Sequence, residues 1–416
     1  MPATEEATVS KGRAILTVGL CCLVAIMEGI DLQAPGLTLP ILGPLFHMSP
    51  GDKGLFLSMS TFGLMIGAAI GGPLSDLIGR KWILIVSAAL FGAFTVLTAM
   101  STSAHMLMAL RFLTGLGMGG ALPNVIALAA ESVSPARRRS AVGFLYAGMP
   151  GGGGVASLVA AFASKPEQWP VVYLVGGVAP LVLVPLLVFL LPKAAPAARS
   201  AEPGARLDVI NALFGEGRAT RTLLLWTGFF FSLLITYLLL GWLPSLMGGR
   251  GLSRPQASTV QVAWSWVGVL GGVGAGLLLD RSRGWRMVAL LFVAAGLALI
   301  FLALAPGQFS LMLLASALAG ATLAGTQAAL YGLAPACYPT RVRGAGVGFA
   351  VAMGRFGSAM GPMLAGVMVG AGWRTEQLLL ALTPILVISA LGAVMVARMA
   401  GAGPAEAWIG LGDAYS

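Results

Sequence analysis

Long apolar segments recur along the whole chain, and they constrain its fold more than any other feature. Each is about as long as the roughly 20 residues that a helix needs to cross the hydrocarbon core of a bilayer. Twelve such runs lie at about 14–39, 54–76, 82–101, 105–130, 139–163, 169–191, 222–246, 257–280, 285–304, 309–333, 344–370 and 377–399. Backbone groups inside lipid must satisfy their hydrogen bonds within the segment, so these runs are expected to be helices. The sequence therefore predicts an all-α membrane protein with twelve transmembrane helices.

The charge content agrees with a chain that is surrounded by lipid. Charged residues make up 10% of the 416 residues and hydrophobic residues 57%, whereas soluble proteins carry about 25% charge. So little charge cannot cover a globular surface with polar groups. A net charge of +10 would suggest a nucleic-acid partner in a soluble protein. Here the positive residues are placed so that they indicate the orientation of the chain in the membrane. We therefore expect a lipid bilayer and no nucleic acid as partner.

The chain contains one membrane unit twice. Three glycines at intervals of four residues precede an acidic, basic turn in both copies, and Pro135–Arg139 recurs as Pro339–Arg343 at an offset of 204 residues. The glycines are Gly63, Gly67 and Gly71 in the first copy and Gly268, Gly272 and Gly276 in the second. Two copies around a central site are typical of a secondary carrier. We expect two pseudo-symmetric six-helix halves at 1–191 and 222–400, a cytoplasmic linker loop at 192–221 and a cytoplasmic tail at 401–416.

Lysine and arginine are distributed unequally between the connections. Of the 25 Lys and Arg residues, 18 fall in the N-terminal tail, in the even-numbered connections or at the C-terminal side, and five fall in the odd-numbered connections. The positive-inside rule then predicts that both termini are cytoplasmic, which agrees with an even number of spans. We expect a multi-pass protein of the plasma membrane, which is the inner membrane if the source is a Gram-negative bacterium.

Four ionisable residues are predicted to lie deep within helices. Glu28 and Asp31 are three residues apart and so share one face of the first helix, while Arg111 and Arg355 lie in the fourth and eleventh. Each charge at the bilayer centre costs about 2.5–3.5 kcal/mol, so we expect these groups to be paired or functional. Burial disfavours the charged form of a carboxyl, and a nearby arginine favours it. A conformational change that alters either effect changes the affinity of the carboxyl for a proton, which suits proton uptake. A planar guanidinium suits a carboxylate substrate. Arginines that merely join helices are the structural alternative.

Other polar and aromatic side chains within the spans are candidates for a central cavity. Aromatic rings beside a cation and an amide would suit an aromatic acid, although each single residue can instead be a helix-packing or interfacial anchor. The candidates for substrate binding, besides Arg355 and Arg111, are Gln33, Asn124, Tyr146, Trp242, Gln327 and Tyr331.

Several motifs that carry chemistry elsewhere do not fit their usual context in this chain. The run Gly115–Gly120 matches GxGxxG, but no strand precedes it, so it predicts close helix packing. The run Gly148–Gly154 is loosely similar to the glycine-proline signature of proton-driven efflux antiporters, and predicts a bent, tightly packed helix. Neither a Walker A sequence nor histidine at ligand or triad spacing is present. We expect no cofactor, no metal and no enzymatic activity.

The turn after the second apolar run resembles the loop signature of the major facilitator superfamily. It reads Gly72-Pro-Leu-Ser-Asp-Leu-Ile-Gly-Arg-Lys81, with Leu77 where the pattern usually has arginine. The resemblance implies the twelve-helix major facilitator fold. It also implies that Asp76, Arg80 and Lys81 latch the cytoplasmic side in one conformation. Asp280 and Arg281 stand at the matching place in the second copy and are assigned to the same latch.

Three helix segments resemble the aromatic acid:proton symporter family within that superfamily. They are Glu28–Gly36, Arg111–Gly119 and Gly354–Gly357. The resemblance implies that Asp31 and Glu28 couple protons, and that Arg355 and Arg111 serve the substrate carboxylate or its relay. It implies a carrier that imports a 3-(3-hydroxyphenyl)propionate-like carboxylate with protons by alternating access.

We expect a monomer whose partners are a small aromatic organic anion, protons and the bilayer. Three alternatives stay open. The first is a proton-driven efflux antiporter for small amphiphilic compounds, and the second is a symporter for another organic anion. The third is a transporter-like membrane sensor that binds a ligand without moving it, although the sequence contains no evident signalling domain.

Overall fold

Long helices make up almost all of the part of the chain that the structure describes. The computed structural model describes residues 11–134, 138–163, 165–191, 213–281, 284–339 and 342–401, and these ranges contain no strand. The helices of the first part are α1 (Lys11–Leu45), α2 (Pro50–Ile78), α3 (Arg80–Thr98), α4 (Ala104–Gly119), α5 (Ala121–Glu131), α6 (Arg138–Phe162) and α7 (Trp169–Leu190). Those of the second part are α9 (Ala219–Gly249), α10 (Arg254–Arg281), α11 (Trp285–Leu304), α12 (Phe309–Leu333), α13 (Arg343–Gly370) and α14 (Thr375–Gly401). Short 3-10 turns, η2 (Pro166–Gln168) and η3 (Ala334–Cys337), precede α7 and follow α12. The all-α prediction is thereby confirmed.

Ten stretches of the described chain are long and apolar enough to cross a membrane. One of them runs through α4 and α5 together, and another runs through α12 into η3. Two further long helices of the described chain, α6 and α13, are not among the ten. In the bundle, α6 contacts α1 and α10 while α13 contacts α9 and α2. The expectation of twelve spans therefore stays a prediction.

The sharp connection between α2 and α3 depends on one glycine. Gly79 has a φ of 91°, and its N–H donates to the carbonyl oxygen of Ser75 at 3.0 Å. Glycine is the residue that reaches positive φ without steric cost, so α2 can end and α3 can begin with no longer loop. At its other end α2 is begun by a capping box, in which Ser49 and Asp52 bond to each other's backbone N–H groups. The chain therefore fixes both ends of α2 locally.

The fourth predicted helix is divided in two at Gly120, and glycines hold its first part close to α2. A Cβ atom added at Gly115 would lie 1.9 Å from the carbonyl oxygen of Ser60, and one at Gly63 would lie 2.0 Å from that of Phe112. Side chains at these positions would force the two backbones apart, as in other small-residue helix contacts. The interpretation of Gly115–Gly120 as a packing element is confirmed.

The glycine repeat does not produce the same contacts in the second copy. The tight approaches of α10 to α12 are at Gly271, whose added Cβ would lie 2.4 Å from the Cα of Ala321, and at Gly320, whose added Cβ would lie 2.4 Å from the carbonyl oxygen of Trp264. Gly272 has looser neighbours at 3.6 Å or more, and Gly276 has none within 4 Å. The repeated glycines of α10 are therefore packed more loosely than those of α2, although the contact of Gly320 with Trp264 matches that of Gly115 with Ser60.

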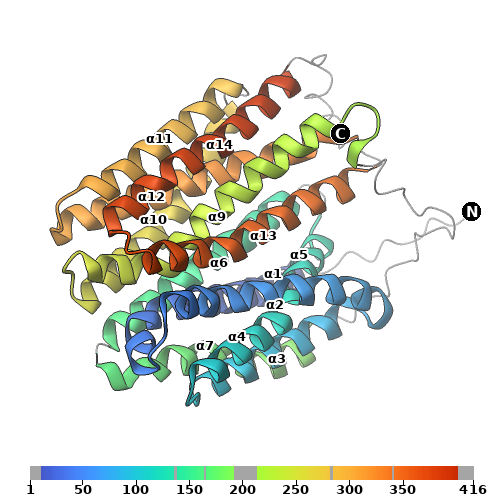
Figure 1. Ribbon diagram of the computed structural model, residues 1–416. Coiled ribbons are helices and arrows are strands. Elements are labelled where there is room, and N and C mark those ends of the chain that lie inside the picture. The colour runs from blue at the N-terminus through green and yellow to red at the C-terminus, as the bar shows by residue number, and fades with distance from the viewer. Residues whose placement is uncertain are drawn as a thin grey trace, which may run out of the picture.

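The helices lie in two groups, with α1 to α7 on one side of the molecule and α9 to α14 on the other (Figure 1). Three pairs of helices join the groups, namely α1 with α9, α2 with α13 and α6 with α10. The backbones of the two groups come close in the second half of α1 and at the start of α2. There an added Cβ at Gly36 would lie 2.7 Å from the carbonyl oxygen of Gly241, and one at Gly54 would lie 2.8 Å from that of Pro362. This seam closes one end of the interface between the groups.

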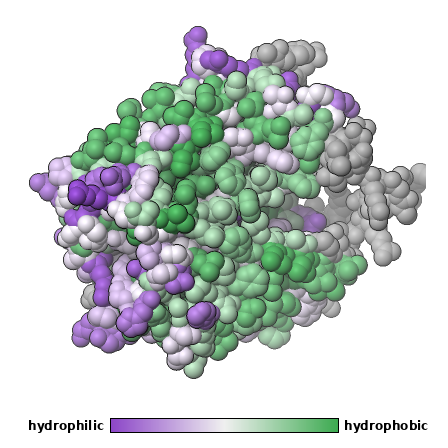
Figure 2. Space-filling model, viewed as in Figure 1, coloured by the Kyte–Doolittle hydropathy of each residue, from purple (hydrophilic) through white to green (hydrophobic). Residues whose placement is uncertain are grey.

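Apolar side chains cover the middle of the surface that Figure 2 shows, whereas hydrophilic residues gather toward the ends of the helices. Large apolar residues such as Phe189, Leu270 and Val367 are more than half exposed. Soluble monomers rarely expose a contiguous apolar surface of this extent. The distribution is that of a protein whose helix surfaces face lipid.

Candidate functional site

A fully buried ion pair connects α1 to α4. The guanidinium of Arg111 donates through Nη1 to Oδ1 of Asp31 at 2.9 Å, and both side chains are 0% exposed. Breaking a buried pair by removing one partner is costly because it leaves an uncompensated charge. Two of the four ionisable residues predicted to lie at membrane depth are thus paired with each other.

Hydroxyl groups complete the surroundings of this pair. The second nitrogen of Arg111 donates to Thr98 at 2.9 Å, to Thr114 at 2.8 Å and to Thr95 at 3.2 Å, and Thr95 donates to Oδ1 of Asp31 at 2.6 Å. The guanidinium also lies 5.1 Å from the ring centre of Tyr173, within the range of a cation–π contact. The ion pair is therefore part of a polar network that α1, α3, α4 and α7 share.

The network leaves some hydrogen-bonding capacity unused. Oδ2 of Asp31, Nε of Arg111 and both carboxyl oxygens of Glu28 are buried and have no hydrogen-bond partner among the described residues. Glu28 lies one helical turn before Asp31 and within electrostatic range of both Asp31 and Arg355. A buried carboxyl without a hydrogen bond is a group that can accept or release a proton at modest structural cost.

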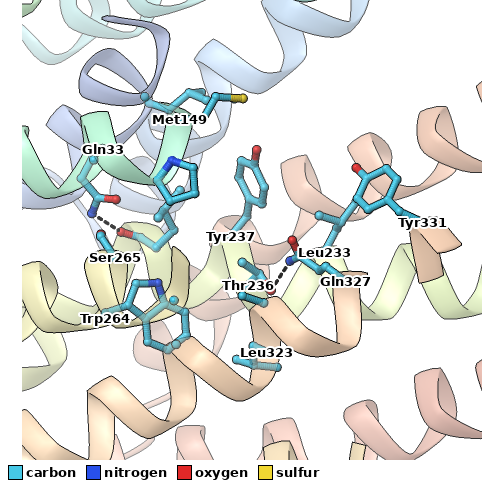
Figure 3. Close-up of a pocket in the computed structure, with 18 of the residues that line it drawn as sticks. Gln33, Met149, Leu233, Thr236, Tyr237, Trp264, Ser265, Leu323, Gln327 and Tyr331 are labelled. Atoms are coloured by element: carbon cyan, nitrogen blue, oxygen red, sulfur yellow. Dashed lines mark hydrogen bonds between the residues drawn. The ribbon is translucent and has the colours of Figure 1, made fainter. Parts of the chain in front are cut away.

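A central cavity lies between the two groups of helices. The space between the atoms that line it is about 960 Å³, its open mouth included. Its walls come from α1, α6, α9, α10, α12 and α13. Figure 3 shows its labelled side chains, with Gln33 and Ser265 at one end, Gln327 and Tyr331 at the other, and Tyr237 between them.

One cation and three aromatic rings give this cavity its chemical character. Among the described residues that line it, Arg355 is the one charged side chain, and the aromatic residues are Tyr237, Trp264 and Tyr331. Arg355 donates through Nη1 to the hydroxyl of Tyr237 at 2.8 Å. The ring of Tyr331 packs edge-on against Phe229 with 5.1 Å between centroids. An apolar, aromatic wall with a guanidinium suits a ligand that combines a ring and an anionic group.

Two predicted amides line the same cavity. Nε2 of Gln33 donates to the carbonyl oxygen of Leu240 at 3.1 Å, whereas its Oε1 has no partner among the described residues. Nε2 of Gln327 donates to the hydroxyl of Thr236 at 2.8 Å. The structure therefore brings together Gln33, Gln327, Tyr331 and Arg355 from the predicted substrate-binding set.

Three other members of that set lie outside the lining of the cavity. Arg111 is in the buried network, Asn124 donates to the carbonyl oxygen of Gly120 at 2.7 Å, and Nε1 of Trp242 donates to that of Pro362 at 3.0 Å. Trp242 thereby joins α9 to α13. The side chain of Tyr146 lies outside the described residues. A role of these four in substrate binding stays a prediction.

The predicted latch residues that the structure describes contact their own half of the chain. Arg80 pairs with Glu131 at the end of α5. Lys81 is 8% exposed and donates to the carbonyl oxygens of Val188 at 2.8 Å and Leu191 at 2.5 Å, at the end of α7. Arg281 is exposed at the end of α10, and the side chains of Asp76 and Asp280 lie outside the described residues. The latch therefore stays a prediction.

Sequence reasoning did not select several residues of the network and the cavity. Tyr237 on α9 and Ser265 on α10 line the cavity, and Thr95, Thr98 and Thr114 surround Arg111. Thr114 follows Arg111 by three residues, a spacing that places both on one helix face, so that contact could have been found. The others lie on different helices, and no spacing in the chain indicates that they meet.

The comparisons with known proteins agree with this architecture. A family model described as Major Facilitator Superfamily matches residues 21–308 and, in a second match, 225–408. A 3-(3-hydroxy-phenyl)propionate transporter of Escherichia coli (strain K12) is 41% identical to this chain, and the alignment covers 94% of the chain and 95% of that protein. The 4-hydroxybenzoate transporter PcaK of Pseudomonas aeruginosa is 33% identical, over 87% of this chain and 88% of its own length.

Solved structures share the fold at low sequence identity. A bacterial homolog of the human lysosomal transporter Spinster superimposes with a TM-score of 0.77 at 17% identity, covering 95% of this chain and all of its own. A D-xylose-proton symporter superimposes with a TM-score of 0.72 at 18% identity, covering 93% of this chain and 97% of its own. The family model and the two relatives confirm the predicted resemblance in sequence, and the solved structures show the same fold.

Proposed function

This chain belongs to the Major Facilitator Superfamily, and from that premise we propose that it imports a 3-(3-hydroxyphenyl)propionate-like aromatic carboxylate together with protons. Like its relatives, which are transporters, it is a multi-pass transporter of the plasma membrane and not an enzyme. The two relatives described above are transporters of hydroxylated aromatic acids. The observation that carries the proposal is a cavity between the two helix groups with an aromatic wall, in which Arg355 is the one cation among the described lining residues.

The proposed assembly has twelve spans, with α4 and α5 forming one of them and both termini in the cytoplasm. The two six-helix halves are residues 1–191 and 222–400, joined by the linker 192–221 and followed by the tail 401–416. Substrate enters the cavity from one side and leaves on the other as the halves rock about it, which is the alternating-access behaviour of such two-part carriers. Support comes from the two helix groups and from the location of the cavity between them.

In the proposed cycle Arg355 binds the substrate carboxylate, with Tyr237 holding the guanidinium in place. A guanidinium can grip two carboxylate oxygens at once, which a lysine cannot do. Glu28 and Asp31 carry the protons, and Arg111 belongs to this relay because it is paired with Asp31 and lies outside the cavity lining. When the substrate neutralises Arg355, the electrostatic field at Glu28 changes, and its proton affinity changes with it.

The driving force depends on the number of protons. One proton moving with a monoanion carries no net charge, so only the pH gradient drives it, at about 1.4 kcal/mol per pH unit. A second proton adds about 2.3 kcal/mol per 100 mV of membrane potential. The presence of two carboxyls in α1 permits the second arrangement.

Uptake in proteoliposomes tests the proposal. Wild-type protein should accumulate labelled 3-(3-hydroxyphenyl)propionate when the inside is alkaline, and a protonophore should abolish accumulation. We expect Arg355→Ala to raise KM at least about tenfold, because a charged hydrogen bond is worth roughly 1.5–3 kcal/mol. Arg374→Ala, at an exposed site in the α13–α14 connection, is the matched control and should transport normally.

Two results would contradict the proposal. Unchanged affinity in Arg355→Ala would exclude the carboxylate contact. Proton-driven loss of preloaded compound, without uptake under the opposite gradient, would identify an exporter of small amphiphiles instead.

A further inference from the structure

One end of the central cavity carries hydrogen-bonding groups that the carboxylate does not need. Gln33 on α1 is 1% exposed, and its Oε1 has no donor among the described residues. An acceptor that is screened from water and lacks a donor carries a penalty that a donated hydrogen bond removes. Arg355, which faces the cavity from α13, belongs to a different part of the wall.

The orientation of the Gln33 amide follows from its one hydrogen bond. The carbonyl oxygen of Leu240 can only accept, so the group that faces it at 3.1 Å must be the NH₂ of the amide. Nε2 is therefore held by α9, and Oε1 is the other atom of the amide, which lies near Gly153 of α6. This backbone contact gives the site an acceptor whose direction is set by α9.

Ser265 on α10 complements this acceptor. Its hydroxyl lines the cavity and makes no hydrogen bond to a described residue. Both groups face the space above Gly153 on α6, because a Cβ atom added there would lie 3.3 Å from Oε1 of Gln33 and 3.6 Å from Oγ of Ser265. Figure 3 shows Gln33 and Ser265 at the same end of the cavity. An acceptor and a hydroxyl thus share one small space that glycine keeps open.

We propose that Gln33 and Ser265 form a subsite that binds the ring hydroxyl of the transported acid. The substrate O–H donates to Oε1 of Gln33, and its oxygen accepts from the Ser265 hydroxyl. Tyr237 and Leu240 are three residues apart on α9, so the Arg355 contact and the Gln33 contact are displaced by roughly 4.5 Å along that helix. The carboxylate then binds at Arg355 while the ring extends toward Gln33.

The subsite would decide which acids are preferred. A site built to hydrogen-bond a hydroxyl rejects an analogue that lacks it, because its own polar groups are then left unpaired. This inference rests on the proposed function, and it adds that the protein prefers hydroxylated rings. The probes are labelled 3-(3-hydroxyphenyl)propionate and labelled 3-phenylpropionate, which differ by that hydroxyl alone.

The experiment compares KM for the two acids in proteoliposomes that contain the full chain. Wild type should prefer the hydroxylated acid, and Gln33→Met, which keeps the shape of the side chain, should reduce that preference roughly tenfold. Its KM for 3-phenylpropionate should stay within about twofold of wild type. Gln261→Met is the matched control and should keep the preference, because Gln261 is an equally buried amide on α10 that does not line the cavity.

Smaller substitutions keep the test decisive if Gln33→Met does not fold. Ser265→Ala should reduce the preference about threefold, and Gly153→Ala should reduce it because the new Cβ occupies the shared space. Equal KM values for the two acids in wild type would overturn the subsite and leave the proposed function standing. The same conclusion would follow if the variants raised KM equally for both acids. Absence of saturable uptake of either acid would overturn the proposed function itself.

Discussion

Glu28 and Asp31 are one helical turn apart, yet their surroundings differ. Asp31 is paired with Arg111 and accepts from Thr95, whereas neither oxygen of Glu28 has a hydrogen-bond partner in the described chain. Removing the charge of Asp31 would leave the Arg111 cation buried and unpaired. Removing that of Glu28 leaves no such orphan. The two carboxyls of α1 therefore have to be tested by different measurements.

We expect Glu28→Gln to separate transport from proton coupling. Glutamine keeps the size of the side chain but cannot take up a proton, so the variant should lose accumulation driven by a pH gradient while retaining counterflow exchange. Its free energy of unfolding should change by less than about 1 kcal/mol, since neither carboxyl oxygen of Glu28 has a hydrogen bond to a described residue that the substitution would break. Paired measurements of gradient-driven uptake and counterflow check this, and gradient-driven accumulation at the wild-type level would exclude Glu28 from coupling.

The corresponding change of carboxyl to amide at Asp31 should have a different effect. Asp31→Asn should destabilise the protein by about 3–5 kcal/mol, because it leaves the Arg111 charge uncompensated in the interior. Thermal unfolding in detergent, followed by tryptophan fluorescence, measures this. A stability equal to that of Glu28→Gln would show that the ion pair is not needed for folding.

At the level of the helix, Lys81 has a structural contact that its latch assignment did not anticipate. It lies at the start of α3, and its ammonium group donates to two carbonyl oxygens at the end of α7. The last carbonyls of a helix have no intrahelical donor, and a cation there also interacts favourably with the helix dipole. Lys81 therefore terminates α7 and fixes it against α3.

We expect Lys81→Met to destabilise the protein by about 1–3 kcal/mol, because it removes the donor from these buried carbonyls. Arg80→Met is the neighbouring control. Its partner Glu131 is 53% exposed, so the loss of that surface pair should change stability by less than about 1 kcal/mol. Thermal unfolding compares the two variants. If the two variants were equally stable and Lys81→Met changed only the transport rate, Lys81 would act as a latch residue and not as a cap of α7.

For the whole molecule, the glycine seam near the α1–α2 connection decides how closely the halves can approach. Gly54 on α2 leaves no room for a side chain, since an added Cβ would lie 3.0 Å from the Cα of Met363. Backbone atoms cannot yield as a flexible side chain can. In the proposed topology this seam closes the outer side of the cavity.

A valine at Gly54 should therefore hold the seam open and slow the transport cycle. Overpacking of this kind costs about 1–3 kcal/mol, so we expect gradient-driven uptake to fall roughly 5- to 150-fold. Gly51→Val, three residues earlier in the same helix, is the control, because its nearest neighbour would be 3.7 Å away. Initial uptake rates at equal protein levels measure the effect, and equal rates for both variants would show that closure of the seam is not part of the cycle.

Some residues of the site and of the helix contacts could be predicted from the sequence, and others could not. The Arg355 charge was recognisable as a cavity candidate because an ionisable residue at membrane depth is expensive. The packing role of Gly115 was recognisable because no strand precedes its motif. Trp242 and Asn124 look equally suitable as cavity residues in the sequence, yet both donate to backbone carbonyls away from the cavity. Which face of a helix meets the cavity depends on its rotation, and the uniformly apolar spans do not encode that rotation in their polarity.

Apolar length, charge content and local turn signals are properties of neighbouring residues, so the order of amino acids alone predicts a helical protein embedded in lipid, and its motifs indicate the superfamily. Tertiary structure decided that Arg111 pairs with Asp31 and that Arg355 lines the cavity with Tyr237. It also decided that Gln33 has an acceptor without a donor. These are contacts between helices far apart in the chain, and they depend on how the helices pack, turn and approach one another.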